Sequence, residues 1–183
     1  FFNWIGIAMS DFVIGNPETA YLSAFIISTF GNFTIFLPIP YALAIFTLGG
    51  QSFIDPLILA VICGFGAGIG EVSAYLIGRG GRNFIEKKYS KQLNSMKAII
   101  EKYGFWAVVL FAASPLPDDT LLIPLGVLKY SLKKTLLASI LGKIGLCALL
   151  AYGGRYTWGF VELIFVGGGA IGTVIGILGT FVL

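Results

Sequence analysis

Two prolines and two carboxylates interrupt an apolar run in the second half of the chain. The run extends from Phe105 to Leu128, and the interruption reads Ser-Pro-Leu-Pro-Asp-Asp from Ser114 to Asp119. Proline removes a helical hydrogen bond, and its ring clashes with the preceding turn. We therefore expect the helix to break at Pro115 and Pro117 rather than to continue through the run.

The composition around this break indicates an integral membrane protein. Of 183 residues, 57% are hydrophobic and 11% are charged, and there are 25 glycines. A soluble domain of this size needs more polar surface, whereas long apolar runs rich in glycine are typical of helices in a bilayer. We predict an all-α integral membrane protein with a single membrane domain over residues 1–183. The first residue is Phe1 rather than Met, so we expect an N-terminal segment before it.

The break occurs twice, because the chain matches itself at an offset of 77 residues. The identities at this offset pair Pro38 with Pro115, Pro40 with Pro117, Gly49 with Gly126, Gly68 with Gly145, and Tyr75 with Tyr152. Such an ungapped match predicts an internal duplication.

Each repeat is predicted to contain a broken hairpin followed by a transmembrane helix. Repeat 1 covers about residues 18–80, and repeat 2 covers about residues 104–155. Two half-length helices around a Pro-x-Pro break are typical of a re-entrant helical hairpin, which enters and leaves the membrane on one face. A bent full span is the alternative. A C-terminal transmembrane helix is predicted over residues 160–183, and its regularly spaced glycines would permit a homodimer.

The transmembrane helices of the repeats are expected over residues 56–78 and 133–153. About 20 apolar residues cover the ~30 Å hydrocarbon core of a bilayer. Small residues allow neighbouring helices to approach closely. We predict close packing at four glycines of the repeats: Gly64, Gly68, Gly126 and Gly145.

The linker over residues 81–103 is polar, with apolar side chains at every third or fourth position. This pattern predicts an interfacial amphipathic helix and argues against a nucleic-acid-binding arm. Seven basic residues lie from Arg79 to Lys102, and three more lie from Lys129 to Lys134, after the second hairpin. If that hairpin is re-entrant, these residues share one face, and the positive-inside rule orients the basic linker 79–103 toward the cytoplasm. Because each unit crosses the membrane once, the second is then an inverted repeat of the first, as in secondary transporters.

Four charged side chains fall inside the predicted membrane region: Glu71, Asp118, Asp119 and Lys143. Each would cost about 2.5–3.5 kcal/mol at the centre of a lipid-facing helix, so we expect them to face one another or water. One interpretation is a structural ion pair, for example between Lys143 and Asp118. The other is a substrate or ion pathway, in which a carboxylate carries H⁺ or Na⁺ and Lys143 binds an anionic headgroup.

No catalytic or metal-binding pattern accompanies these charges in the sequence. Histidine is absent, and the two cysteines, Cys63 and Cys147, have a spacing that fits no metal motif. Ser114 beside Asp118 is not enough for a nucleophile with its base. We predict no enzyme, no metal and no cofactor, and an enzyme acting on lipid phosphates is the weakest of three interpretations.

The segment Gly-Glu-Val-Ser-Ala-Tyr-Leu-Ile-Gly-Arg-Gly, residues 70–80, resembles a segment of the DedA family. This family is also called the VTT or SNARE-associated Golgi protein domain. Pro38 with Gly49, and Pro115 with Gly126, resemble the family's two proline-centred re-entrant hairpins. The resemblance implies a role in moving lipids across bilayers: bacterial members resemble translocases of polyprenyl phosphate carriers, and eukaryotic relatives are phospholipid scramblases.

The resemblance also gives an expectation for individual residues. Glu71 stands at the position of the family's functional acidic residue. Tyr41 replaces an acidic residue after the first hairpin's proline, and Ala112 and Asp118 stand where bacterial members carry arginines. The Ser-Pro-Leu-Pro-Asp-Asp version resembles a divergent branch labelled small multidrug export proteins. We predict a translocase of membrane lipid or lipid-linked phosphate, with H⁺ or Na⁺ as candidate coupling ions; an ion-coupled exporter of small cationic solutes is the alternative.

Overall fold

The computed structural model describes residues 16–33, 41–114 and 119–167, and its regular elements are all helices. The helices are α2 (Pro17–Phe33), α3 (Tyr41–Gly50), α4 (Pro56–Gly70), α5 (Val72–Gly80), α6 (Arg82–Ala112), α7 (Asp119–Val127) and α8 (Leu132–Gly167). The predicted all-α class is confirmed for this part of the chain.

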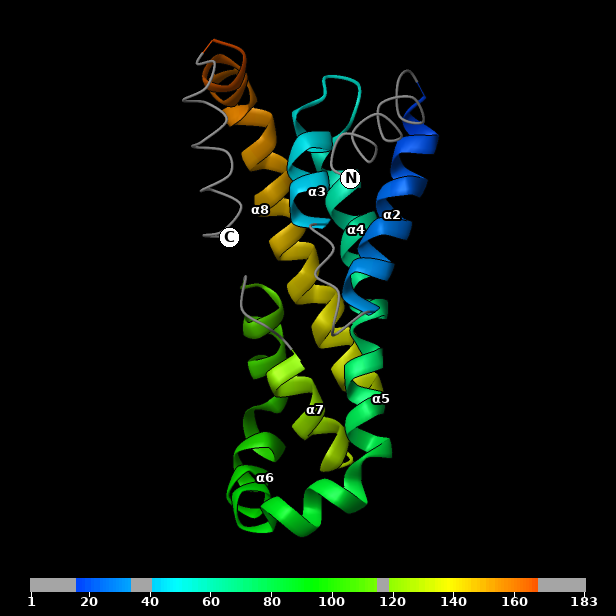
Figure 1. Cartoon of the computed structure of the whole chain (residues 1–183), viewed down its shortest axis with the longest axis vertical. Helices are drawn as coiled ribbons and strands as arrows, with labels where there is room; N and C mark the ends of the chain where they lie inside the picture. The colour runs from blue at the N-terminus through cyan, green and yellow to red at the C-terminus, as the bar shows by residue number, and fades with distance from the viewer. Residues whose placement is uncertain (1–15, 34–40, 115–118, 168–183) are drawn as a thin grey trace.

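Two long antiparallel rods form the centre of the molecule. Figure 1 shows α4 followed by α5 along most of the long axis, with α8 returning in the opposite direction. The stretches Pro56–Gly80 and Leu132–Thr157, of 25 and 26 residues, are long and apolar enough to cross a membrane. They agree with the two predicted transmembrane helices.

Local chemistry explains where the first of these rods begins and why it hardly bends. The Asp55 carboxylate accepts hydrogen bonds from the Leu57 and Ile58 amides, at 2.8 and 3.1 Å, and Pro56 occupies the first helical position. Both features favour a helix start. At the α4–α5 junction, Glu71 keeps helical dihedrals and its amide donates to the Ala67 carbonyl. The two helices therefore run on as one rod.

Four shorter helical segments pack against the two central rods. α2 packs on α4 and α3 on α8, while the second half of α6 packs on α8 and α7 packs on α5. In Figure 1, α2 ends and α3 begins part-way along the long axis, and α6 ends and α7 begins part-way along it from the opposite end. The predicted breaks at Pro38, Pro40, Pro115 and Pro117 lie outside the described residues.

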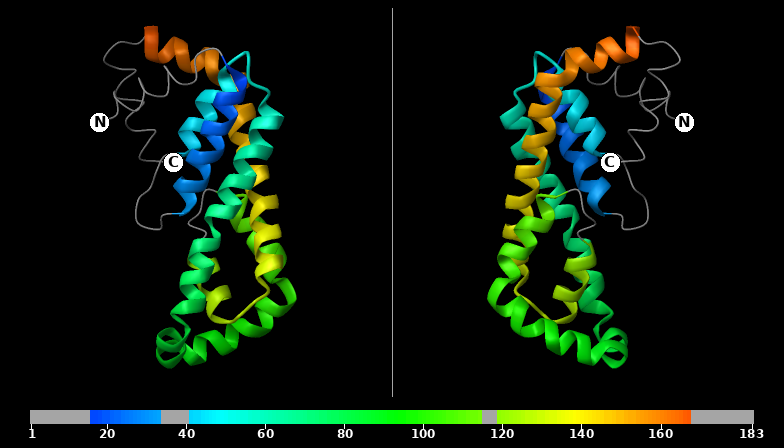
Figure 2. Two further views of the ribbon diagram at one scale, coloured as in Figure 1. Left: turned by 90° about the vertical axis from the view of Figure 1, so that its right-hand side faces the viewer. Right: turned by 90° about the vertical axis from the view of Figure 1, so that its left-hand side faces the viewer.

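Two helices run through boundaries that the sequence pattern predicted. α6 is a single helix from Arg82 to Ala112, so the linker and the first arm of the second hairpin are continuous. α8 passes the expected end at Gly153 and continues to Gly167, into the stretch assigned to a separate C-terminal helix. Figure 2 shows that both change direction along their length. Gly154 does not end α8 because it serves a contact instead: a Cβ there would clash with the Phe46 carbonyl of α3.

Among the residues that the structure describes, the buried side chains form two hydrophobic clusters, one in each half of the molecule. The first, which includes Ile45, Leu59 and Ala151, joins α2, α3, α4 and α8. The second, which includes Tyr75 and Leu125, joins α5, α6, α7 and α8. Lys143 and Glu71 belong to neither cluster, although both are buried.

Candidate functional site

Glu71 and Lys143 form an ion pair in the interior of the helix bundle. Lys143 Nζ lies 2.6 Å from Glu71 Oε1, and the side chains are only 5% and 3% exposed. Glu71 projects from the α4–α5 junction and Lys143 from the middle of α8, so the contact joins the two long rods. Two of the four predicted intramembrane charges are therefore brought together.

The packing of α4 against α8 sets this pairing. Gly64 faces Ile144 and Gly68 faces Ile140, so the helices run antiparallel in close contact. A Cβ on either glycine would lie 2.6 Å or less from the isoleucine, which only a glycine avoids. The lysine side chain leans toward the N-terminus of α8 and thereby toward Glu71.

Tyr41 completes the polar surroundings of Lys143. Its hydroxyl accepts a hydrogen bond from Lys143 Nζ at 3.4 Å, and Nζ lies 5.8 Å from the centre of its ring. Tyr41 is the first residue of α3 and is half-buried. The ammonium group thus contacts a carboxylate, a hydroxyl and the face of an aromatic ring, which all favour a cation.

The two cysteines lie close to this group rather than apart from it. Cys147 is one helical turn beyond Lys143 on α8, and it shares a buried cluster with Cys63. Both thiols are free and fully buried. They agree with the expected role as small packing residues and also border the ion pair.

The other predicted charges are described less fully. Asp119 is the first residue of α7 and is half-buried. Asp118 lies outside the described residues, so the alternative pair between Lys143 and Asp118 stays a prediction.

The four predicted packing glycines differ in their surroundings. Gly64 and Gly68 face α8, and a Cβ on Gly126 would clash with the Tyr75 carbonyl. Gly145, in contrast, is exposed, and a Cβ there would meet no atom within 4 Å. Its position one residue beyond Ile144 turns it away from α4, so the described contacts do not support close packing at Gly145.

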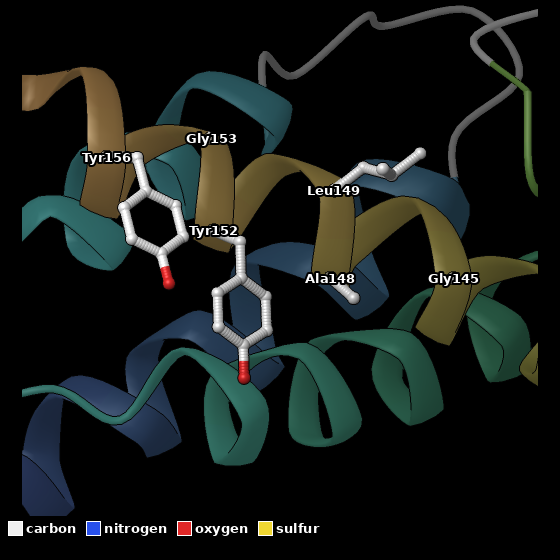
Figure 3. A pocket seen from close by; sticks show the side chains of 6 residues that line it. All are labelled: Gly145, Ala148, Leu149, Tyr152, Gly153 and Tyr156. Carbon is white, nitrogen blue, oxygen red and sulfur yellow. The ribbon is translucent and has the colours of Figure 1, made fainter.

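Gly145 instead lines an open groove on the outer face of α8. Figure 3 shows this groove, with Tyr152 and Tyr156 at one end; their rings stack with centroids 6.3 Å apart and an 18° interplanar angle. Ala148, Leu149 and Gly153 complete its lining. The groove faces away from the buried ion pair and contains no charged side chain among its lining residues.

Sequence reasoning missed the role of Tyr41 and of two buried serines, Ser28 and Ser139. Tyr41 was identified only as a replacement for an acidic residue. Ser139 precedes Lys143 by four residues, and this helical spacing is a signal that could have found it. Ser28 had no such signal, because its place depends on how α2 packs.

A family comparison agrees with these observations. Residues 38–156 match the model of the VTT domain. No curated protein and no solved structure matches the chain. The match covers well over half of the chain and contains α4, α5, α8 as far as Tyr156, the ion pair and Tyr41. It confirms the resemblance drawn from residues 70–80 and agrees with a membrane protein of the transporter type. The chain belongs to the VTT-domain family.

Proposed function

We propose that this protein moves a lipid or polyprenyl-phosphate carrier across the membrane, with the Glu71–Lys143 pair at the centre of the pathway. The observation that carries the proposal is the pair itself: two opposite charges buried between two membrane-spanning helices in a VTT-domain protein. Ionisable side chains at this depth are costly, and in transporters they mark substrate and ion pathways.

The arrangement of the short helices supports two re-entrant hairpins. α2 and α3 both extend from one end of the molecule and stop part-way along it, and α7 and the end of α6 do the same from the other end (Figure 1). Backbone that turns at membrane depth is tolerated where protein or a polar cavity surrounds it. The two hairpin tips would then approach the ion pair from opposite faces.

Matching contacts support an inverted repeat. The close contact of Gly154 with the Phe46 carbonyl corresponds to that of Gly78 with the Ile123 carbonyl. Phe46 and Ile123 are related by the offset of the sequence repeat. In each case the second arm of one hairpin packs on the long rod of the other repeat.

A second pair of glycine contacts also joins the arm of one hairpin to the long helix of the other repeat. Gly49 lies against the carbonyl of Ala151, and Gly126 lies against that of Tyr75. The second arm of each hairpin therefore packs on the long helix of the other repeat, so the two repeats interlock around the ion pair. Such interlocked inverted repeats place a binding site between the halves in secondary transporters.

The chemistry of the pair suits an anionic headgroup. Lys143 presents a point charge to a phosphate, and the Glu71 carboxylate competes for the same ammonium group. A headgroup that binds Lys143 would release Glu71, which could then bind H⁺ or Na⁺. The basic residues at the α5–α6 end would concentrate anionic lipid at the cytoplasmic face.

Reconstituted liposomes test the proposal. We expect the wild type to move a fluorescent phospholipid or a polyprenyl phosphate between leaflets, and we expect Glu71→Gln and Lys143→Met to lower the rate at least tenfold. Asp118→Asn and Asp119→Asn test the remaining predicted pathway residues in the same assay. Glu101→Gln is the matched control, because this side chain is exposed. No movement of either lipid under a proton or Na⁺ gradient would refute the proposal and favour export of small cationic solutes.

A further inference from the structure

A file of buried polar side chains extends the Glu71–Lys143 pair along the contact between α4 and α8. On α8, three residues four apart lie on one face: Ser139, Lys143 and Cys147. On the opposite rod, Cys63 and Glu71 are eight residues apart and also share a face. Eight residues of helix span about 12 Å, so the file covers a substantial part of a ~30 Å hydrocarbon core.

The members of the file are contiguous. The packing of Gly64 on Ile144 brings Cys63 near the level of Cys147, and both thiols belong to one buried cluster. Cys147 in turn adjoins Lys143. Ser28, on α2, interacts with the Cys63 thiol from the side. Ser28 therefore adjoins the thiols from α2, and Ser139 lies one helical turn from Lys143 on α8, close to the level of Gly68.

The two serines are the informative members. Ser28 and Ser139 are 0% and 1% exposed, and within the described part of the chain neither Oγ has a hydrogen-bond partner. A thiol is only a weak hydrogen-bonding group, so Cys63 does not satisfy Ser28. A buried hydroxyl without a hydrogen-bond partner destabilises the folded protein.

Neighbouring side chains show that a hydroxyl in these helices can be satisfied by a backbone carbonyl of its own helix. Thr29 Oγ1 donates to the Phe25 carbonyl at 2.8 Å, and Thr135 Oγ1 donates to the Ser131 carbonyl at 3.1 Å. Both bonds run to the preceding turn of the same helix, which any serine in a helix can reach. Ser28 and Ser139 do not make this bond, so their hydroxyls are available to a ligand inside the bundle.

We propose that the file from Ser28 to Ser139 is an internal site for water and small monovalent cations, leading to the Glu71–Lys143 pair. Buried water makes two to four hydrogen bonds to polar groups that would otherwise be unsatisfied. Within the described part of the chain, the Ser28 and Ser139 hydroxyls are such groups. The site would supply the pair with the ion that replaces Lys143 at Glu71, and in this respect the inference rests on the proposed function.

The native thiols report on this site. Ag⁺ is a small, soft monovalent cation that binds thiolates, and it can reach Cys63 and Cys147 only through a hydrated path. The full chain in liposomes is exposed to silver nitrate in chloride-free buffer. At each time the sample is unfolded in detergent, and the remaining free thiols are counted with a maleimide. Cys63→Ala and Cys147→Ala assign each signal, and size-exclusion chromatography of each variant checks the fold.

We expect both thiols to react in the folded wild type, and Ser28→Ala or Ser139→Ala to slow the reaction at least tenfold. Thr135→Val is the matched control: Thr135 is buried one turn from Ser139 on α8, but its hydroxyl is satisfied by its own helix. It should change the rate by less than twofold. Thiols that stay unreactive until the protein unfolds, or rates that the serine variants leave unchanged, overturn the proposal.

The experiment separates this inference from the proposed function. A protein that moves lipid but resists Ag⁺ refutes the internal site alone. A protein that reacts with Ag⁺ but moves no lipid keeps the internal site and refutes the lipid translocase.

Discussion

Replacing Lys143 by methionine tests the energetics of the buried pair. Methionine keeps the unbranched shape of the lysine stem but removes the ammonium group that contacts Glu71 at 2.6 Å. The Glu71 carboxylate, 3% exposed, then stays buried without its cation. Breaking one side of a buried ion pair destabilises proteins by about 3–5 kcal/mol.

The size of the effect has an upper limit, because the carboxyl group can take up a proton. A glutamate in water has a pKa of about 4.3, so holding one neutral at pH 7 costs about 2.7 pH units, or ~3.7 kcal/mol. At pH 5 the same cost falls to ~1 kcal/mol. The penalty is small near pH 4.3 and grows as the pH rises, because only the unfolded state then releases the proton.

Thermal unfolding in detergent at several pH values is the assay. For a chain of 150–250 residues, 1 kcal/mol shifts Tm by about 2–4 °C, so Lys143→Met should lower Tm by roughly 7–15 °C at pH 7. At pH 5 the loss should shrink to a few degrees. A Tm loss that is the same at both pH values would refute the reasoning.

The double variant Glu71→Gln/Lys143→Met provides the control. Replacing a buried ion pair by neutral groups of similar shape is often neutral or stabilising. We expect the double variant to recover most of the stability that Lys143→Met loses. An additive loss would show that the two side chains do not stabilise each other.

Three further predictions concern the helix packing around the ion pair and the orientation of the protein in the membrane. Gly126→Ala should lower the free energy of unfolding by about 1–3 kcal/mol, because the new Cβ meets the Tyr75 carbonyl. Gly145→Ala should change it by less than about 0.5 kcal/mol, because a Cβ there meets no atom within 4 Å, and thermal unfolding compares the two variants. Tyr75→Phe should lower the free energy of unfolding by about 1–2 kcal/mol, because it removes the 2.5 Å hydrogen bond from the Tyr75 hydroxyl to the Tyr130 carbonyl after α7. Thermal unfolding measures this loss as well. A cysteine at Lys134 should react with an impermeant maleimide from the cytoplasm and one at Tyr156 from the opposite side; labelling of both from one side would refute the orientation.

The sequence predicted the rods, their order and the two charges that meet between them. Glu71 and Lys143 could be identified because charged residues in apolar helices must find polar surroundings. That they contact each other depends on the register of α4 against α8, which Gly64 and Gly68 set through contacts with distant residues. An isolated sequence contains no direct signal for such a register.

Glycines were the main source of wrong boundaries. Gly153 was expected to end α8, but the adjacent Gly154 instead admits the Phe46 carbonyl to the helix surface, and the helix continues. A glycine can end a helix or allow close packing, and only the tertiary neighbour decides between these roles. The same ambiguity explains Gly145, which matched Gly68 in the sequence repeat but lies on the open groove.

The most direct test of the central claim compares lipid movement by the wild type with that of Glu71→Gln/Lys143→Met in liposomes. The double variant should be folded and nearly as stable as the wild type, so its activity reports on the pathway rather than on the fold. We predict that it moves fluorescent phospholipid and polyprenyl phosphate at least tenfold more slowly than the wild type does. An unchanged rate in the folded double variant would contradict the claim that this ion pair forms the centre of the pathway.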